Sequence, residues 1–279
     1  MEQHQWKDVH YRGTIVRVDY RAQKADGTTW LKYANVYLPY GYDETKPYNI
    51  LYLMHGGGGN PDAWLDCSQI KNALDRGFAE ERSKPFIVVF PTYYNLNPAE
   101  RRSSGIDAAW ENAQVFGFQK ELEEALIPAV EGRFHTFADG TDHQALVSSR
   151  RHRAFSGFSM GGCTTWYAFM EHLDIIGTFL PLSGDCWVIE PTGGKEHAAE
   201  TAKALAECVR RFGYTKDDFK LLIATGDLDI AYGNLTPQVE AMKAYPELFG
   251  DMQYVVKEGA VHAYEEVYHH IWNYLPQIF

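Results

Sequence analysis

The chain has 279 residues, of which 45% are hydrophobic and 23% are charged. This length and balance are typical of one large globular domain, and they exclude a disordered or low-complexity chain. The formal net charge of −11 argues against nucleic acid or an anionic membrane as a partner, because the surface as a whole repels phosphate groups.

The N-terminal segment MEQHQWKDVHYRGT has no apolar core of the kind that a secretory signal peptide needs. No later stretch approaches the ~20 apolar residues of a membrane-spanning helix. We therefore expect either a cytoplasmic protein or a secreted one whose signal peptide or flanking modules have been removed. The sequence makes no prediction of the oligomeric state.

Polar and apolar residues then alternate in TIVRVDYRA and WLKYANVYLP, and the turn signal Ala-Asp-Gly stands between them at 25–27. A period of two is typical of strands with one solvated face. These residues predict a pair of antiparallel strands.

Short apolar runs and longer amphipathic segments alternate along the rest of the chain. The runs are NILYLMH (49–55), FIVVFP (86–91), RAFSGFS (153–159), GTFLPLSG (177–184), KLLIATG (220–226) and MQYVVKEG (252–259), and the helical segments include FQKELEEALIPAVEGRF (118–134), HAAETAKALAECVRRF (197–212) and AYEEVYHHIWNYL (263–275). Runs buried on both faces indicate a parallel sheet covered by helices on both sides. The predicted fold class is α/β, with one domain over residues 1–279 and antiparallel strands at the N-terminal edge of the sheet.

Residues 188–212, VIEPTGGKEHAAETAKALAECVRRF, look like an insertion, in which Pro-Thr-Gly-Gly forms a hinge before an amphipathic helix. We expect this segment to be either a lid over the ligand site or a helix packed rigidly on the sheet.

The four cysteines, Cys67, Cys163, Cys186 and Cys208, are widely spaced and form no CxxC pair. This spacing argues against a zinc site of the usual kind and against a disulfide scaffold. We expect mostly free, buried thiols.

A glycine run, Gly56 to Gly59, follows the first apolar run and begins directly after His55. Ligand sites in such sheets lie beyond the carboxyl ends of the strands, so this loop is expected at the site. Glycines leave backbone N–H groups uncovered, so the loop can direct them at an oxyanion. The run lacks the Lys-Ser/Thr ending of a P-loop and is not the GxGxxG of a dinucleotide fold. We interpret His55 as a brace for the loop.

Ser159 stands in Gly157-Phe158-Ser159-Met160-Gly161, between an apolar run and the helical segment CTTWYAFMEHL. This G-x-S-x-G pattern is typical of a sharp strand-to-helix turn that lifts a nucleophilic hydroxyl out of the backbone. Its position after a predicted strand strengthens the prediction that Ser159 is a nucleophile.

Two aspartates, Asp227 and Asp229, directly follow the run KLLIATG. We favour Asp229 as the acid of a catalytic triad. Asp227, which would instead cap the local turn, and Asp185, which follows the run GTFLPLSG, remain alternatives.

His262 comes three residues after the run MQYVVKEG and is the favoured base. A histidine in the loop between the last strand and the last helix can swing its ring over the sheet edge. His269 and His270 fall within the last helical segment, so we expect them to be surface or packing residues. The resulting order of serine, aspartate and histidine along the chain is that of the α/β-hydrolases.

Several motifs combine these residues. They are YLMHGGGGNPDAW (52–64), FSGFSMGG (155–162), PLSGDCW (181–187), ATGDLDIAYGN (224–234) and EGAVHAYEEVYHHIWNYLP (258–276). Together they resemble the esterase D-like α/β-hydrolases, and specifically the feruloyl and acetyl xylan esterases of carbohydrate esterase family 1. The resemblance spans about residue 10 to the end of the chain.

This resemblance implies an α/β-hydrolase fold in which Ser159 is the nucleophile, His262 the base and Asp229 the acid. It also implies an oxyanion hole formed by the backbone N–H groups of Gly57 and Met160. The chain departs from many relatives in the residues after His262, which puts the shape of the leaving-group side in question.

The implied reaction is hydrolysis of carboxylic esters through an acyl-enzyme, which requires no metal or organic cofactor. The implied substrate carries hydroxycinnamoyl (feruloyl) groups on arabinoxylan, as a small molecule or oligosaccharide ester. An acetyl xylan esterase or a small-molecule esterase of the S-formylglutathione hydrolase type is the alternative. Aromatic side chains in loops that should rim the site, Trp64, Trp110 and Trp187 among them, are candidates for substrate binding, with Trp187 favoured. The alternative for each tryptophan is that it only packs in the core.

Overall fold

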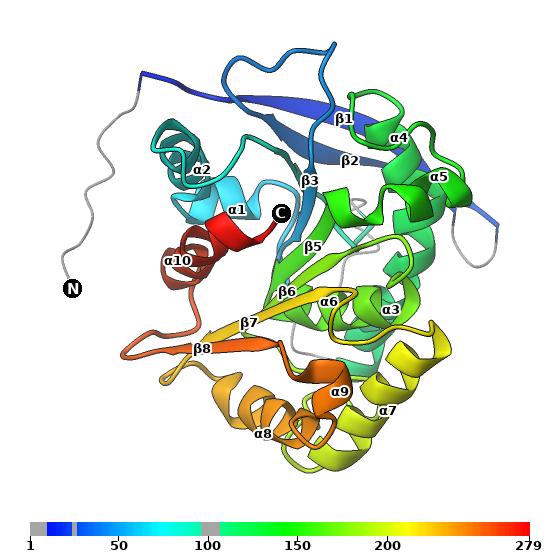
Figure 1. The fold of residues 1–279 in the computed structure, drawn as a ribbon, viewed down its shortest axis with the longest axis vertical. Helices are drawn as coiled ribbons and strands as arrows, with labels where there is room; N and C mark the ends of the chain where they lie inside the picture. Colours follow the sequence, from blue (N-terminus) through cyan, green and yellow to red (C-terminus); the bar gives the residue numbers. More distant parts are fainter. Residues whose placement is uncertain (1–9, 24–26, 96–106) are drawn as a thin grey trace.

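The computed structural model describes residues 10–23, 27–95 and 107–279. Within these residues, eight strands form a single sheet in the order β1-β2-β4-β3-β5-β6-β7-β8 (Figure 1). The strands are β1 (Thr14–Gln23), β2 (Thr29–Leu38), β3 (Ile50–Met54), β4 (Ile87–Phe90), β5 (Arg153–Phe158), β6 (Thr178–Leu182), β7 (Lys220–Gly226) and β8 (Gln253–Lys257). Each lies on a run expected from the sequence. The turn expected at 25–27 falls largely on residues 24–26, outside the described residues.

Both antiparallel pairs of the sheet lie at its N-terminal edge, where β2 runs opposite to the other strands. β1 pairs antiparallel with β2 along its whole length, and β2 pairs antiparallel with β4. From β4 through β3 to β8 every neighbouring pair is parallel. The predicted α/β class with antiparallel strands at the N-terminal edge is confirmed.

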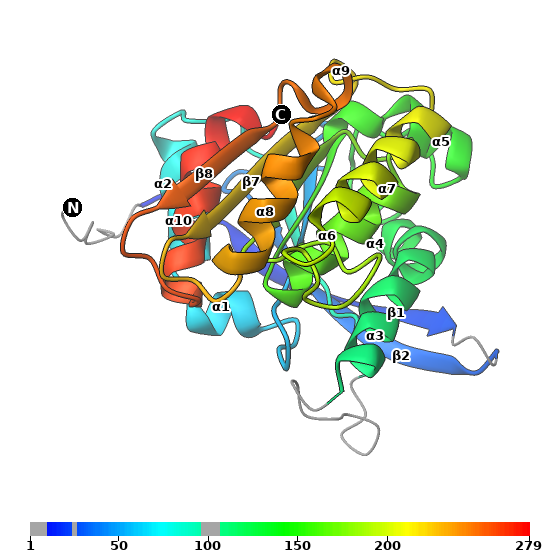
Figure 2. The ribbon, with the colours of Figure 1, turned by 90° about the horizontal axis from the view of Figure 1, so that it is seen from below.

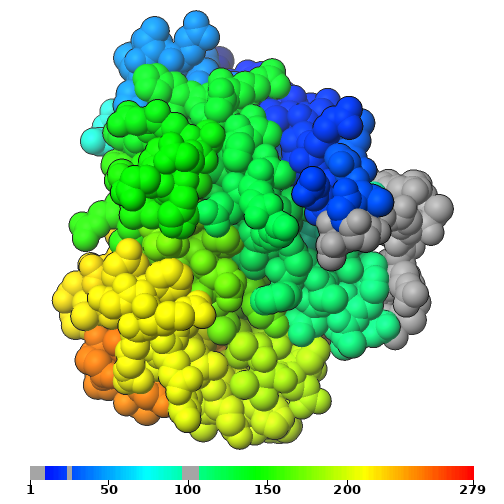
Figure 3. All heavy atoms as spheres, turned by 90° about the vertical axis from the view of Figure 1, so that its right-hand side faces the viewer, coloured from blue at the N-terminus to red at the C-terminus, as the bar shows by residue number. Residues whose placement is uncertain are grey.

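Helices cover both faces of the sheet (Figures 1 and 2). One face packs against α1 (Ala63–Cys67), α2 (Ile70–Ala79) and α10 (Tyr264–Tyr274), and the other against α3 (Ala108–Glu121), α4 (Ile127–Glu131), α5 (His143–Ser148), α6 (Met160–Glu171), α7 (Ala198–Arg211), α8 (Tyr232–Met242) and α9 (Pro246–Phe249). Figure 3 looks onto the second face, where α3, α5 and α7 form the outer surface.

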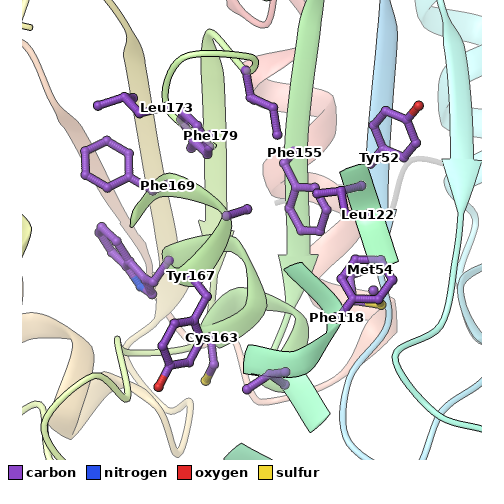
Figure 4. Packing of buried hydrophobic residues seen from close by; sticks show 14 of the residues in the cluster. Tyr52, Met54, Phe118, Leu122, Phe155, Cys163, Tyr167, Phe169, Leu173 and Phe179 are labelled. Atoms are coloured by element: carbon purple, nitrogen blue, oxygen red, sulfur yellow. The ribbon is translucent and has the colours of Figure 1, made fainter. Parts of the chain in front are cut away.

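The central strands are apolar on both sides because each side meets a helical layer. In β3, Leu51 and Leu53 belong to the core under α1, α2 and α10, whereas Tyr52 and Met54 belong to the core under α3 and α6. Figure 4 shows part of this second core, with Tyr52, Met54 and Phe155 of the strands against residues of the helices. Continuous apolar runs are what a strand buried on both faces requires.

β8 departs from the expectation of burial on both faces. It pairs only with β7 within the described residues, and Gln253, Val255 and Val256 are exposed. An edge strand makes fewer apolar contacts than a central one. The valines of β8 therefore reflect the preference of β-branched residues for extended backbone as much as burial.

The helix expected at 118–134 begins earlier and is broken. α3 starts at Ala108, where the side chain of Asp107 accepts a hydrogen bond from the Trp110 N–H and caps the helix. A π-helical segment, Leu122–Leu126, then separates α3 from α4. A π-helix has about one more residue per turn than an α-helix. The apolar pattern of the sequence did not indicate this change, because the change depends on how the helix packs.

α7 occupies most of the segment that we expected to be either a lid or a packed helix. Its buried side chains include Ala202, Leu205 and Val209, which belong to the same core as α6 and α8. A lid made of α7 would have to leave this core. In the structure, α7 is a helix packed on the sheet.

All four cysteines are free. Cys163, Cys186 and Cys208 are buried and Cys67 is exposed, as expected of mostly buried thiols. Among the described residues, no helix combines the length and the apolar character that crossing a bilayer would require.

Candidate active site

Ser159 lies at the turn between β5 and α6, in a backbone conformation that few serines adopt. Its φ is 59° and its ψ is −121°, and holding such a conformation costs about 1–3 kcal/mol. The glycines on either side permit the turn: a Cβ on Gly157 would lie 2.3 Å from the Gly161 carbonyl oxygen, and one on Gly161 would lie 2.6 Å from that of Met54. The two glycines of the G-x-S-x-G pattern are therefore required by close backbone contacts.

The structure brings Ser159, His262 and Asp229 together from three strand ends. Ser159 Oγ lies 2.8 Å from His262 Nε2, and His262 Nδ1 lies 2.6 Å from Asp229 Oδ1. With Nδ1 protonated, the ring donates to the carboxylate and accepts the serine proton at Nε2. This arrangement can activate the hydroxyl as a nucleophile.

Asp229 is fixed in this position by its own loop. Its Oδ1 also accepts a hydrogen bond from the Ala231 N–H at 2.8 Å, and its side chain is only 2% exposed. Asp227 points elsewhere and accepts from the Gly259 N–H at 2.6 Å, which is the turn-capping role considered for it.

Asp185, the other candidate acid, organises the loop after β6. Its carboxylate accepts hydrogen bonds from the Gly194 N–H at 3.0 Å and from Trp187 Nε1 at 3.2 Å. Burial raises the pKa of this carboxyl above its usual range. Both contacts face the loop and neither involves His262.

His262 lies in the loop between β8 and α10, with its ring 4.5 Å from that of Phe158. His269 and His270 both lie on α10. His270 is buried as a packing residue, and the ring of His269 stacks on Tyr268.

His270 makes the stability of the protein dependent on pH. Burial, with a smaller effect of Lys257, lowers the pKa of His270 from 6.5 to about 4. The unfolded chain therefore binds a proton below pH 6.5 that the folded chain takes up only near pH 4. Stability is lost as the pH falls through this window, by about 2 kcal/mol at pH 5 relative to pH 7.5.

This loss can be measured by urea denaturation of the wild-type protein and of His270→Asn at pH 7.5 and pH 5. The wild-type protein should lose about 2 kcal/mol more than the variant between the two pH values. An equal loss in both proteins would show that His270 is not the group responsible.

The glycine loop is held by hydrogen bonds on both sides of Gly57. The Gly56 N–H donates to the hydroxyl of Tyr264 at 2.8 Å, and the Gly58 N–H donates to the hydroxyl of Tyr94 at 3.1 Å. Gly57 is exposed, and within the described residues its N–H meets no protein acceptor.

His55 lies beneath the loop as the expected brace. Its Nδ1 is 2.7 Å from the Gly56 carbonyl oxygen, and its Nε2 is 2.7 Å from Thr92 Oγ1. The side chain is 1% exposed. His55 therefore fixes the loop from within the protein.

The expectation that Trp64 rims the site is wrong. Trp64 is 1% exposed, and its Nε1 donates to the Met54 carbonyl oxygen at 2.9 Å. Its ring packs edge-on against Tyr264 and Phe158. The short helix α1 turns this side chain inward, so Trp64 supports the floor of the site.

Trp110 and Trp187 occupy different positions. Trp110 is partly exposed and stacks on Tyr94 with ring centroids 5.8 Å apart, so it adjoins the glycine loop. Trp187 is 7% exposed and is tied to Asp185 through its indole N–H. Their predicted contact with substrate stays a prediction.

An aliphatic rim next to the acid and the base was not anticipated from the sequence. Leu228 and Ile230 flank Asp229, Val261 precedes His262, and all three side chains are exposed. Their apolar character, in segments that also carry the acid and the base, was the only signal in the sequence. These exposed side chains form apolar surface on the two loops that carry the acid and the base.

Comparisons with known proteins give a consistent result. The family model described as "Putative esterase" matches residues 30–278. The chain is 38% identical over 275 residues to endo-1,4-beta-xylanase Y of Acetivibrio thermocellus, and the match covers 96% of this chain and 23% of the xylanase. The chain thus spans about a quarter of the length of this curated relative.

Solved structures share the fold. A serine-to-alanine mutant of the feruloyl esterase module from Clostridium thermocellum, complexed with sinapinate, has a TM-score of 0.82 and 36% identity, over 99% of this chain and 91% of that chain. The S-formylglutathione hydrolase of Staphylococcus aureus has a TM-score of 0.64 and 16% identity, over 96% and 97% of the two chains, which shows the fold alone. The chain has the α/β-hydrolase fold and belongs to the esterase family whose model matches residues 30–278, as its resemblance to carbohydrate esterase family 1 predicted.

Proposed function

We propose that this protein is a serine esterase that releases feruloyl groups from plant cell-wall arabinoxylan. The observation that carries the proposal is the chain of hydrogen bonds from Ser159 through His262 to Asp229, at 2.8 Å and 2.6 Å. A hydroxyl in this setting, on a strained turn, is suited to attack an ester carbonyl.

The reaction proceeds in two steps. As Ser159 Oγ attacks the carbonyl carbon, its proton passes to His262 Nε2, and the carbonyl oxygen becomes an oxyanion. His262 then gives this proton to the departing alcohol oxygen, which leaves an acyl group on Ser159. A water molecule, deprotonated by His262, releases the acid and regenerates the serine.

Gly57 and Met160 supply the oxyanion hole in this proposal. Met160 is the first residue of α6, so its N–H belongs to the first turn, which has no acceptor within the helix. The N–H groups next to Gly57 are both bonded to tyrosine hydroxyls, which leaves the Gly57 N–H available. Donors of this kind act on the charge that develops in the transition state.

The feruloyl preference is supported by the relatives and by the rim of the site. The xylanase relative and the sinapinate-bound module point to hydroxycinnamoyl esters of xylan. The aliphatic rim of Leu228, Ile230 and Val261 suits the apolar faces of such a ring, and we assign Trp110 and Trp187 to substrate contacts as well. Action on cell-wall esters implies work outside the cell, the second of the two compartments expected.

The test is hydrolysis of methyl ferulate and of 4-nitrophenyl acetate, measured side by side with Ser159→Ala as the blank. Methyl ferulate should be hydrolysed, and the variant should show no turnover above the uncatalysed rate. Turnover of the acetate alone would favour an acetyl xylan or small-molecule esterase. Turnover of neither would favour a binding protein that has kept the triad geometry.

A further inference from the structure

Two tyrosine hydroxyls accept hydrogen bonds from the N–H groups on either side of Gly57. Tyr264 binds the Gly56 N–H at 2.8 Å, and Tyr94 binds the Gly58 N–H at 3.1 Å. Three consecutive glycines would otherwise sample many backbone conformations, because none has a Cβ. Of the N–H groups of Gly56, Gly57 and Gly58, only that of Gly57 is bonded to neither tyrosine.

We propose that Tyr264 and Tyr94 are positioning residues that hold the glycine loop so that the Gly57 N–H faces the oxyanion. This inference rests on the proposed function, because it assigns a role within the same oxyanion hole. The hydroxyls of both tyrosines accept hydrogen bonds from the backbone of the loop, so each acts through the backbone that it fixes. Such positioning matters because a preorganised donor requires no rearrangement when the charge develops.

Tyr264 is itself held rigidly by the floor of the site. Its ring packs edge-on against Trp64 at 5.1 Å and against Phe158 at 4.9 Å. Trp64 is anchored to the end of β3, and Phe158 directly precedes Ser159. The hydroxyl that orients the loop is therefore connected to the two strands that carry the loop and the serine.

Tyr264 also lies two residues after His262, at the start of α10. The same short segment therefore presents the base to Ser159 and a hydroxyl to the glycine loop. Burial raises the pKa of Tyr264 well above its usual range, so the hydroxyl keeps its proton at any pH at which the enzyme works. One segment thus positions both the base and the glycine loop.

Tyr94 connects the two halves of the oxyanion hole. Its hydroxyl accepts from the Gly58 N–H and lies 3.8 Å from Met160 Sδ, to which it can donate. Stacking on Trp110 and an edge-on contact with Tyr93 fix the ring. Tyr94 therefore contacts Gly58, the neighbour of Gly57, and the side chain of Met160.

The experiment replaces each tyrosine by phenylalanine, which preserves the ring contacts and removes only the hydroxyl. Tyr264→Phe and Tyr94→Phe should each lower kcat on the preferred ester by about 10-fold or more, while KM changes little. The reason is that removing an oxyanion donor lowers kcat by about 10²–10³-fold, and displacing the donor should cause part of that loss. Tyr274→Phe is the matched control. Tyr274 lies on the same helix, and its hydroxyl donates to the Ile223 carbonyl oxygen at 2.8 Å, away from the loop.

A transition-state analogue separates positioning from a merely structural role. Phenylboronic acid accepts Ser159 Oγ at boron while the serine proton passes to His262, and the resulting tetrahedral anion places an oxygen in the oxyanion hole. Its affinity should fall in Tyr264→Phe and Tyr94→Phe by about the same factor as kcat. The KM for methyl ferulate, which is a neutral ester in its ground state, should change far less.

Several results would overturn the inference. If kcat and boronate affinity are unchanged in both variants, or if Tyr274→Phe loses as much kcat, Tyr264 and Tyr94 are only structural residues. These results differ from a failure of the proposed function, which would appear as no turnover of methyl ferulate or as turnover that survives in Ser159→Ala. Loss of turnover in Ser159→Ala with full activity in both tyrosine variants would contradict this inference alone.

Discussion

Replacing Asp229 with alanine is expected to lower kcat on the preferred ester by about 10⁴-fold, because His262 loses the carboxylate that orients its ring and stabilises its charged form. Asp229 Oδ1 lies 2.6 Å from His262 Nδ1, and the side chain is 2% exposed. Since His262 becomes charged only on the way to the transition state, KM should change far less than kcat. Steady-state kinetics of the purified variant measure both constants, with Ser159→Ala giving the background rate.

The two other candidate acids provide controls. Asp227→Ala removes an acceptor for the Gly259 N–H, at a distance from the histidine, and should leave kcat nearly unchanged. Asp185→Asn retains an oxygen for Gly194 or Trp187 and should affect mainly the loop after β6. A collapse of kcat in Asp185→Asn, with activity kept in Asp229→Ala, would move the acid to the preceding strand.

Much of the fold was predictable because burial on both faces of a strand leaves a continuous apolar run in the sequence. β3 and β5 are short, and each is buried along its whole length. Since parallel strands end at one edge of the sheet, residues after several runs were expected to meet. That rule was sufficient to group Ser159, Asp229 and His262, although the chain separates the first and the last by 103 positions.

The sequence favoured Asp229 but left Asp227 open, because both residues closely follow β7. The choice depends on the turn of the following loop, in which the Ala231 N–H holds Asp229 and the Gly259 N–H holds Asp227. Such contacts involve single backbone groups, and no periodicity in the sequence reports them.

Side chains that support the site from a distance were the least predictable. The Gly56 N–H and the Tyr264 hydroxyl are 208 positions apart, and nothing local to either residue indicates the contact. Trp64 was misplaced for a related reason: a tryptophan after a glycine loop fits a binding surface as well as a core. Only the packing of α1 against α10 turns it inward.

Replacing Glu131 with alanine is expected to destabilise the protein by about 3–5 kcal/mol, because it leaves a buried guanidinium without its charge partner. Arg153, the first residue of β5, donates to both oxygens of Glu131 at 2.7 Å and 2.8 Å, and neither side chain is more than 1% exposed. Tyr52 and Thr136 donate to the same carboxylate at 2.9 Å. The variant would leave three side chains, which together donate four hydrogen bonds, without this acceptor.

Urea denaturation at pH 7.5 measures this loss as a lower midpoint with an unchanged slope. Glu247→Ala is the matched control: its carboxylate lies 3.0 Å from Arg210, but both side chains are more than half exposed, so it should cost about 0–1 kcal/mol. Equal losses in the two variants would contradict the stabilising role of the buried pair. Because Arg153 begins the strand that ends beside Ser159, the folded fraction of Glu131→Ala should keep its kcat at low temperature, which separates the stability of the strand from the chemistry at its end.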